Sequence, residues 1–525
     1  MGTLVVAALA VLSAAIFLLA KRRGRSATLP LPPGPRPLPF IGNALDMPTG
    51  DIPGGLHALC EQYGDIVYLN VLGQHMVVLG THEAAVDLLE KRSANYSDRP
   101  LSPMTEISGF SWGLTSLPYG PWWRRYRRAM HQHFNLNAVE RYAGWQEVEA
   151  HRLVRRLIDS PEHFVSHIRH FFGSMVLRVT HGLEVDEEEE DFLKVADEAL
   201  EVFAVVLEPG RYLVEVLPAL AYLPSWMPGA GFKRHAASWR RSARRLFEVP
   251  WNAAMDAINR GTALPSMAAH IMERAKSLPA EEAVQEEEVG KYATASAYGG
   301  GADTTLSTVQ TFFVAMLLYP EIQKKAQEEL MRVVGPNRLP EKKDLADLPY
   351  TQALAKECLR WRTVAPLAVP HRSLEDDEYK GYLIPKGTTI LANIWAFSHD
   401  ERYFSDPDVF KPERHLRDGH LDPDVMDPAT IVFGYGRRVC PGQHFAQTSL
   451  LIAIATVLHT LDITPPDGPD GMPILPSGKM TRGLLSYPEP FQCKFASRST
   501  EREALLRAGC EGFEMGSLSA NLSSS

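Results

Sequence analysis

The sequence predicts a mainly α-helical protein with small β regions, placed behind an apolar N-terminal segment. Three observations predict this fold class: a long stretch of helical periodicity from about residue 120 to about residue 360, short runs of strand character on either side of it, and an uncharged apolar run at the start of the chain. Loops interrupt the helical stretch at Leu207–Gly210 and Pro224–Gly231. The strand-like runs are Ile66–Leu72, Met76–Leu79, Tyr382–Ile384 and Thr388–Ala392.

The N-terminal run Thr3–Ala20 contains 18 uncharged, almost wholly apolar residues and is followed by four basic residues, Lys21, Arg22, Arg23 and Arg25. As a helix it would span roughly 27 Å, about the hydrocarbon thickness of an endoplasmic-reticulum bilayer. A cleaved signal peptide usually carries its positive charge before the apolar run, so the order found here favours a retained anchor. The positive-inside rule then predicts a single-pass protein of the endoplasmic-reticulum membrane, with its body in the cytosol.

The anchor is followed by a proline-rich segment, residues 31–39, in which five of the nine residues are proline. Proline fixes φ and lacks an amide donor, so this segment is expected to be a stiff, extended spacer. A recognition ligand for a proline-binding domain is the alternative interpretation. The predicted division of the chain is residues 1–20 as transmembrane anchor, 21–47 as basic, proline-rich hinge, 48–496 as catalytic body and 497–525 as a disordered tail.

Composition excludes some classes of function. The net charge is −9, with 54 basic and 63 acidic residues, which does not favour a nucleic-acid partner. The five cysteines form no closely spaced pair, which suits a reducing compartment and predicts no disulfide framework. A lone cysteine is usually buried and inert, so its neighbours must show whether it has a chemical role.

Cys440 has such neighbours, because it lies in the run Phe-Gly-Tyr-Gly-Arg-Arg-Val-Cys-Pro-Gly over residues 433–442. This run matches the pattern Phe-x-x-Gly-x-Arg-x-Cys-x-Gly, and the sequence here resembles the cytochrome P-450 family. The alternative, a glycine-rich hairpin that happens to contain a cysteine, leaves the combination of fixed residues unexplained. The resemblance covers nearly the whole chain and implies a single, mainly helical catalytic domain that binds haem b, with Cys440 as the iron ligand.

Each residue type in this loop has a use in holding haem. A cysteine thiolate bound to haem iron pushes electron density toward the oxygen-binding side and favours O–O cleavage. Gly434 lets the backbone turn tightly, Phe433 covers the sulfur, and Arg438 pairs with a haem propionate. Pro441 suits the first turn of a helix, which would place Cys440 at that helix's positive end.

The resemblance implies further propionate contacts. Trp123 and Arg127 are four residues apart and match the family's Trp-x-x-x-Arg motif. Arg99 and His371 match family positions that contact propionates as well. The alternative for the segment around Trp123 is a basic helix on a membrane surface. The remaining arginines are expected to form a basic face for an acidic reductase; they are Arg124, Arg125, Arg128 and Arg437.

Glu357 and Arg360 lie three residues apart on one predicted helix face, where they can pair. Such pairs are common on solvated helices, but Arg414 follows downstream within Pro412-Glu413-Arg414. The resemblance implies that Glu357, Arg360 and Arg414 form a buried charge network with a structural role.

Asp303 and Thr304 follow three adjacent glycines, residues 299–301, inside a long apolar helical pattern that runs to Leu318. Each glycine costs a helix about 1 kcal/mol relative to alanine, so we expect a local opening of the helix that makes room for dioxygen and water. Thr304 would offer its hydroxyl to the dioxygen site, and Asp303 would relay protons from solvent. A simple helix kink with exposed polar residues is the alternative.

These features predict a monooxygenase that receives electrons from NADPH through a separate cytochrome P-450 reductase, because only about 85 residues follow Cys440 and no flavin domain is expected there. Cytochrome b5 is a second candidate electron donor. A haem-thiolate isomerase or dehydratase and a haem sensor are alternatives. The pair Asp303–Thr304 argues against both, because neither needs a helix equipped to activate oxygen.

The substrate is expected to be a lipophilic small molecule, because the segments that match the family's pocket are mostly apolar. The whole chain looks most like fungal microsomal members, particularly mushroom enzymes of secondary metabolism, so a sesquiterpenoid is the first hypothesis. An indole, a polyketide or a fatty acid is the alternative, and Glu106, Glu208 or Glu215 could pair with an amine. The pocket segments are Leu101–Leu117, Phe203–Phe232, Val364–Val369 and Arg482–Ser486.

Overall fold

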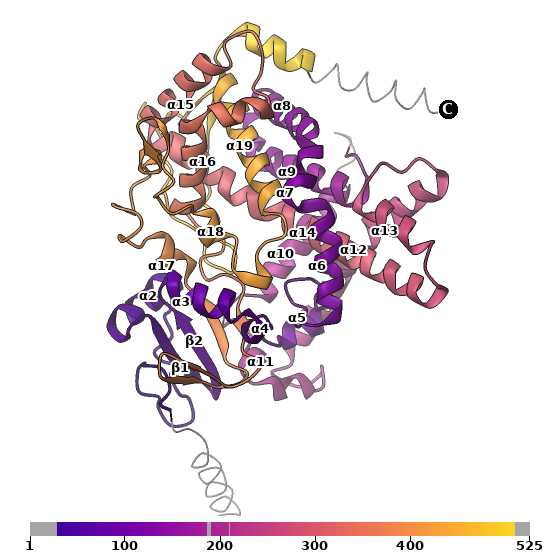
Figure 1. The fold of residues 1–525 in the computed structure, drawn as a ribbon, viewed down its shortest axis with the longest axis vertical. Helices are drawn as coiled ribbons and strands as arrows, with labels where there is room; N and C mark the ends of the chain where they lie inside the picture. Colours follow the sequence, from indigo (N-terminus) through magenta and orange to yellow (C-terminus); the bar gives the residue numbers. More distant parts are fainter. Residues whose placement is uncertain (1–28, 186–190, 209, 510–525) are drawn as a thin grey trace, which may run out of the picture.

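The computed structural model describes residues 29–185, 191–208 and 210–509. Long helices gather around α14 (Ala280–Leu318), and a four-stranded sheet lies beside them, at the lower left of Figure 1. The predicted fold class, mainly helical with small β regions, is therefore confirmed for the described residues. The predicted anchor, residues 1–20, lies outside them.

Before α14, the short helices α2 and α3 lie against the sheet, and most of the longer helices that follow pack against α14. The longest of them are α8, α9, α10 and α12, and α12 is followed by α13 at the right of Figure 1. Their bounds, with the shorter helices, are α2 Ile52–Tyr63, α3 His82–Ala85, η1 Val86–Lys91, α4 Ser93–Tyr96, α5 Pro103–Ser108, α6 Pro121–Phe134, α7 Leu136–Val139, η2 Glu140–Tyr142, α8 Ala143–Asp159, η3 Pro161–His163, α9 Phe164–His181, α10 Asp191–Val206, α11 Leu213–Val216, η4 Pro218–Tyr222, α12 Gly231–Arg260 and α13 Met267–Ala275.

The helices after α14 cover its other side and carry the cysteine loop. Helices α16 and α19 both pack against α14, and α15 packs against them in turn. The bounds are α15 Pro320–Val333, η5 Lys342–Asp347, α16 Pro349–Trp361, α17 Ile394–Ser398, η6 Pro412–His415, α18 Ala429–Val432, η7 Gly436–Arg438 and α19 Gln443–Thr460.

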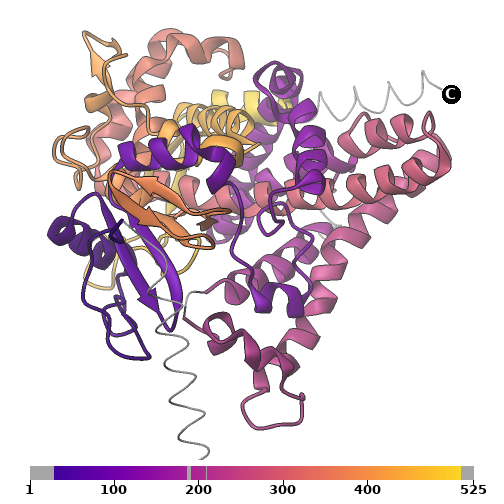
Figure 2. The same cartoon turned by 60° about the horizontal axis from the view of Figure 1, so that its bottom comes forward.

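The main sheet combines two strands from before the long helices with two strands from after α16. Its order is β1-β2-β6-β3, with β2 and β6 parallel and the other pairs antiparallel. The parallel pairing sets Met76 opposite Thr389, and Figure 2 shows this sheet from the side that is lowest in Figure 1. Three further sheets have two strands each. The strands are β1 Ile66–Val71, β2 Gln74–Leu79, β3 His371–Arg372, β4 Asp377–Tyr379, β5 Tyr382–Ile384, β6 Thr389–Ala392, β7 Leu416–Arg417, β8 His420–Leu421, β9 Leu461–Thr464 and β10 Lys494–Ser497.

Helix α14 is buried along its C-terminal half, from Thr305 to Leu317. The glycines that precede this half were expected to open the helix, but every residue of α14 is α-helical. Gly301 serves packing instead: a Cβ there would lie 2.7 Å from Val176 of α9, so only glycine allows the two helices to approach this closely. The prediction of a local opening is therefore wrong for this structure.

The body of the protein begins before residue 48. Residues 30–37 form neither helix nor strand, and they pack against β1 and β5 rather than leading up to the body. Tyr68 N donates to Pro33 O at 2.8 Å, and Leu383 N donates to Pro30 O at 2.8 Å. The described part of the predicted hinge is thus an integral part of the body.

The folded body also extends beyond residue 496, its predicted end. Residues 500–509 are helical, and Leu506 on this helix is fully buried. Arg502 donates to the carbonyl of His459 at 2.9 Å, which ties this helix to the end of α19. Disorder from residue 497 onward is therefore wrong up to residue 509. Within residues 29–185, 191–208 and 210–509, no helix has the length and apolar character needed to cross a membrane.

Candidate functional site

The loop that carries Cys440 is closed by its own backbone. Cys440 N donates to Phe433 O at 2.8 Å, and Gly434 and Gly436 adopt left-handed conformations, with φ of 78° and 54°. Glycine is the residue that takes this conformation without strain. At Gly436 a Cβ would lie 2.1 Å from the carbonyl oxygen of Leu89, so the loop lies directly against η1. The predicted tight turn at Gly434 is confirmed.

Cys440 precedes helix α19, although not in the expected way. The helix begins at Gln443, with Gly442 as its N-cap, so Pro441 lies before the first turn rather than in it. Burial raises the pKa of the Cys440 thiol, while a hydrogen bond from the Gly442 backbone and the charge of Arg127 act in the opposite direction. A thiol in this setting becomes a thiolate when a metal cation replaces its proton.

Arg99, Arg438 and His371 come together next to this loop. Burial, and then the charge of Arg438, hold the pKa of Arg99 well below its usual value. Burial and the two arginines hold the pKa of His371 well below its usual value as well. Like charges in a buried cluster repel each other, so the cluster favours an anion.

Backbone carbonyls accept hydrogen bonds from several of the N–H groups in this cluster. Arg99 and Arg438 each donate three hydrogen bonds to such carbonyls. His371 Nδ1 lies 2.7 Å from Tyr96 O, so in the neutral ring Nδ1 carries the proton and Nε2 can only accept. The carbonyls that Arg99 and Arg438 reach belong to Ser97, Leu114, Thr115, Leu117, Val369 and Pro370.

Trp123 and Arg127 of α6 reach the same loop. The guanidinium of Arg438 lies over the Trp123 ring, 4.7 Å from its centre, and Arg127 donates to the carbonyl oxygen of Val439. The indole Nε1 of Trp123 is buried and has no hydrogen-bond partner among the described residues. A buried N–H without an acceptor is costly, so this atom also indicates a missing acceptor.

The donor set therefore fits haem. A flat, apolar cofactor with two carboxylates and a metal can be held by a sulfur ligand, cationic partners and buried N–H groups, and this site offers all three. They come from Cys440, Arg438, Arg99, Arg127 and Trp123. The structure thus brings the residues predicted from the loop motif and the Trp-x-x-x-Arg motif into one cluster. Phe433 is half-buried at the end of α18.

Asp303 and Thr304 are adjacent on α14 but have different partners. The Thr304 hydroxyl donates to Gly300 O at 2.7 Å, which leaves its lone pairs available to water. One carboxylate oxygen of Asp303 accepts a hydrogen bond from the Tyr487 hydroxyl, and the other lies 4.0 Å from Arg169. Sequence reasoning missed Tyr487, because nothing local at residue 487 signals a contact with residue 303.

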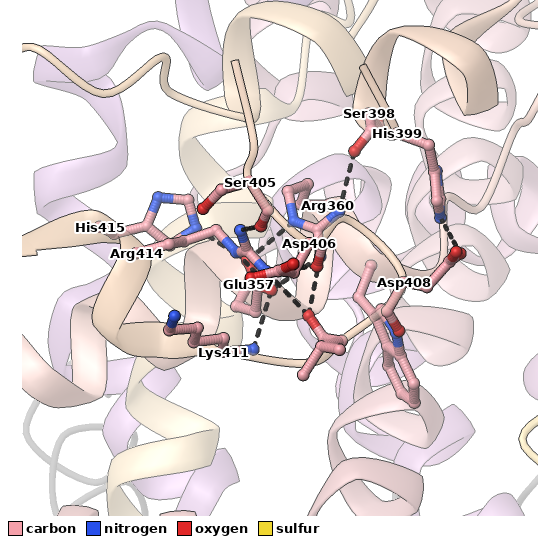
Figure 3. A network of polar contacts seen from close by, with 12 residues as sticks. Glu357, Arg360, Ser398, His399, Ser405, Asp406, Asp408, Lys411, Arg414 and His415 are labelled. Atoms are coloured by element: carbon pink, nitrogen blue, oxygen red, sulfur yellow. Dashed lines mark hydrogen bonds and ion pairs between the residues drawn. The ribbon is translucent and has the colours of Figure 1, made fainter. Parts of the chain in front are cut away.

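The predicted charge network is confirmed, and Figure 3 shows its side chains gathered around Glu357. Glu357 accepts from Arg360 at 2.7 and 2.9 Å and from Arg414 at 2.9 Å. His415 lies 3.0 Å from the same carboxylate and was not predicted, because histidine after Pro-Glu-Arg has no signature of its own. Burial alone would raise the pKa of Glu357, but hydrogen bonds from Arg360 and His415 and the arginine charges outweigh it and lower this pKa to about 2.

The predicted basic face is smaller than expected. Arg124, Arg128 and Arg437 are exposed, but Arg125 donates to Glu286 of α14 at 2.9 Å, and Arg274 of α13 pairs with the same carboxylate. Arg125 thus binds α6 to α14 and is not part of an exposed face.

The segments predicted to line the substrate pocket meet in pairs. Ser486 N donates to Val364 O at 2.8 Å, and the rings of Phe110 and Phe203 are 5.1 Å apart. The three candidate partners for a substrate amine are otherwise engaged or exposed. Glu106 is exposed, Glu208 pairs with Arg211, and Glu215 accepts hydrogen bonds from Ser102 and Met104 of α5.

Comparison with known proteins agrees with this geometry. The cytochrome P-450 family matches residues 32–495. Three relatives, each 39% identical, are the cytochrome P-450 monooxygenase COX1 of Coprinopsis cinerea, the cytochrome P-450 monooxygenase claR of Ampulloclitocybe clavipes and the tryptamine 4-monooxygenase of Psilocybe cyanescens. The alignments cover 93%, 91% and 94% of this chain and 95%, 88% and 97% of the respective relatives. The chain is therefore an enzyme of the cytochrome P-450 monooxygenase family, whose members bind haem.

Proposed function

We propose that the protein inserts one atom of dioxygen into a lipophilic small molecule, with Cys440 as the sulfur ligand of its haem iron. The observation that carries this proposal is the convergence of Cys440 with Arg99, Arg438 and the unpartnered indole N–H of Trp123. The overall reaction is RH + O2 + NADPH + H+ → ROH + H2O + NADP+. The electrons come from NADPH through a separate cytochrome P-450 reductase, with cytochrome b5 as a further candidate donor.

The haem, when bound, supplies oxygen activation, and the chain holds and shields it. Cys440 binds the iron, and the hydrogen bond from the Gly442 backbone lowers the charge density on its sulfur. Arg438 and Trp123 orient the propionates. The exposed Arg124, Arg128 and Arg437 supply positive charge for an acidic electron-transfer partner.

Side chains of the protein must deliver the protons that the reaction consumes. Reduction of the second oxygen atom to water consumes two protons, which would have to reach the site where dioxygen is reduced. The Thr304 hydroxyl would accept a hydrogen bond from water at that site, since its own proton is held by Gly300 O. Asp303 carries protons from the solvent side of α14.

Replacing these two residues should separate the two roles. Thr304→Ala is expected to keep haem and substrate binding but to divert NADPH into hydrogen peroxide, lowering product per NADPH by about tenfold. Asp303→Asn should slow NADPH consumption and product formation together, because it removes the proton carrier. NADPH consumed, peroxide formed and product formed are measured in each variant with one confirmed substrate. Unchanged coupling in Thr304→Ala would transfer the role to Thr305, and NADPH-independent turnover would support an isomerase or dehydratase.

For the substrate we propose a sesquiterpenoid, with an indole, polyketide or fatty acid as the alternative. The engagement or exposure of Glu106, Glu208 and Glu215 supports an uncharged substrate over an amine, since none of them offers a free buried carboxylate. A panel of terpenoids, indoles and fatty acids is tested for displacement of the iron-bound water, seen as a shift of the haem absorption band. A shift by tryptamine alone would favour the indole alternative.

We also propose that the protein is a single-pass protein of the endoplasmic-reticulum membrane, with its catalytic body in the cytosol. Large apolar side chains are exposed in two separate segments of the body, which supports a second contact with lipid. Phe40 and Leu45 are 97% and 76% exposed, and Tyr222 and Trp226 are 89% and 76% exposed. The segment of Phe40 and helix α11, which precedes Tyr222, both lie toward the lower end of Figure 1.

Deleting Met1–Arg25 should release most of the protein from membranes while haem stays bound, because the deletion removes the apolar run of 18 residues. The measurement is the fraction of haem protein in the membrane pellet. Full retention in the pellet would contradict the anchor as the main attachment. Combining the deletion with Trp226→Ser would then locate the second contact.

A further inference from the structure

A cavity of about 330 Å³ lies on the side of α14 where Asp303 projects. Its walls come from α9, α10, α14 and the segment after Ser486, and it contains both apolar and ionisable groups. The charged and titratable groups that line it are Arg169 of α9, Asp197 and Glu201 of α10, Asp303 of α14 and Tyr487.

Tyr487 is the closest partner of Asp303 in this cavity. Its hydroxyl donates to one carboxylate oxygen, whereas Arg169 stays 4.0 Å from the other and pairs more closely with Asp197, at 3.2 Å. Burial, and then the charge of Asp303, raise the pKa of Tyr487, so the phenol remains a protonated donor. The side chain of Asp303 is 16% exposed, which gives the carboxylate limited access to water.

The position of the Tyr487 hydroxyl is fixed by the backbone around it. Thr481 N donates to Tyr487 O at 2.7 Å, and Tyr487 N donates to the Thr481 hydroxyl at 3.0 Å. Ser307 of α14 donates to Ser486 O at 2.6 Å. The segment is thus tied to the helix that carries Asp303, and the phenol approaches the carboxylate from a fixed direction.

Gln310 indicates that water occupies the cavity. Its side chain is only 7% exposed, and its Oε1 has no hydrogen-bond partner among the described residues. A buried acceptor beside ionisable groups, in a cavity large enough for water, is ordinarily satisfied by ordered water. Gln310 lies about two turns from Asp303 on α14, so water there would extend toward the carboxylate.

We propose that Tyr487 is a positioning residue for Asp303, and that its hydroxyl holds the carboxylate in the water-accessible cavity where it takes up protons. The inference rests on the proposed role of Asp303 in proton delivery. Adjacent helix positions point about 100° apart, so a carboxylate that faces this cavity is turned away from Thr304. The hydrogen bond from Tyr487 therefore defines the position in which the Asp303 carboxylate takes up a proton.

Tyr487→Phe removes the hydroxyl and little else, which makes it the test. Product formation is expected to fall roughly tenfold, equivalent to about 1.4 kcal/mol and typical of one hydrogen bond to a charged group. The solvent deuterium isotope effect on NADPH consumption should rise, because proton uptake becomes more limiting. In an Asp303→Asn background the same substitution should have no further effect, since the carboxylate to be positioned is absent.

Tyr298→Phe is the matched control. Tyr298 is a buried tyrosine of α14, the helix that carries Asp303. Its hydroxyl donates to Phe192 O at 3.0 Å and not to Asp303. It should leave the isotope effect at the wild-type value. A crystal structure of Tyr487→Phe supplies a readout that does not depend on turnover: the Asp303 carboxylate should leave the position it has beside residue 487.

The possible failures are distinguishable. If Asp303→Asn slows turnover but Tyr487→Phe leaves rate, isotope effect and carboxylate position unchanged, the role of Tyr487 is overturned and the proposed function stands. If adding Tyr487→Phe to Asp303→Asn lowers the rate by the same factor as it does in the wild type, the hydroxyl does not act through Asp303. The inference is then overturned too. If Asp303→Asn itself has no effect, the proposed proton delivery fails before Tyr487 is considered.

Discussion

Replacing Glu357 by alanine is expected to yield a protein that does not hold its fold around haem. The substitution leaves Arg360, which is fully buried, and Arg414 without the carboxylate that both contact at 2.7–2.9 Å. An unpaired buried charge costs about 3–5 kcal/mol, a large part of the stability of a typical protein. The network also joins α16 to η6, and α16 packs against α18 and α19, the helices on either side of the cysteine loop. Haem content and resistance to proteolysis are the measurements.

Glu413→Ala is the matched control, because Glu413 is the neighbour of Arg414 but pairs with Lys325 near the surface. An exposed ion pair contributes at most about 1 kcal/mol, so this variant should retain haem. Equal loss in both variants would contradict a special role of the buried network.

The same network predicts an acid transition. The folded pKa of Glu357, about 2, lies below the ordinary glutamate value of 4.5, so its ionised form stabilises the fold above about pH 4.5. This contribution is lost as the pH falls from about 4.5 toward 2. The stability of Glu357→Gln should therefore depend less on pH in this window than that of the wild type, as measured by unfolding at several pH values.

Cys440→Ala is expected to abolish the thiolate-type carbon monoxide difference spectrum and all oxygen insertion. The other three cysteines in the described part of the chain are Cys60, Cys358 and Cys493, and all are buried. Burial, with the charge of Asp65 second, raises the pKa of Cys60 to about 12, and burial also raises the pKa values of Cys358 and Cys493. None of them is therefore a replacement ligand. Cys493→Ala is the control and should keep the spectrum.

Local sequence patterns predicted the positions of helices and strands, because these depend mainly on neighbouring residues. The helical period located α14 and its end at Leu318, and the alternating runs located β1, β2, β5 and β6. The loop motif and the Trp-x-x-x-Arg motif were associated through the family resemblance and not through a local pattern, because Arg127 contacts Val439 across 312 residues. The same holds for Trp123 and Arg438.

Contacts between distant segments could not be predicted in this way. Arg125 was assigned to an exposed face, yet its partner Glu286 lies 161 residues along the chain. Tyr487 and Asp303 are 184 residues apart in the sequence, and no sequence pattern around either residue indicates their hydrogen bond. The glycines before Asp303 were assigned to oxygen chemistry, whereas Gly301 is required by Val176 of another helix. The ordered segments 29–47 and 500–509 were underestimated for the same reason, since their packing depends on the rest of the body.

X-ray absorption at the iron edge of the purified haem protein tests the central claim most directly, because it reports the ligand atoms themselves. The wild type and Cys493→Ala should each show one sulfur in the first coordination shell of iron. Cys440→Ala should show nitrogen and oxygen ligands only. A wild-type shell without sulfur, or a sulfur that persists in Cys440→Ala, would contradict Cys440 as the iron ligand.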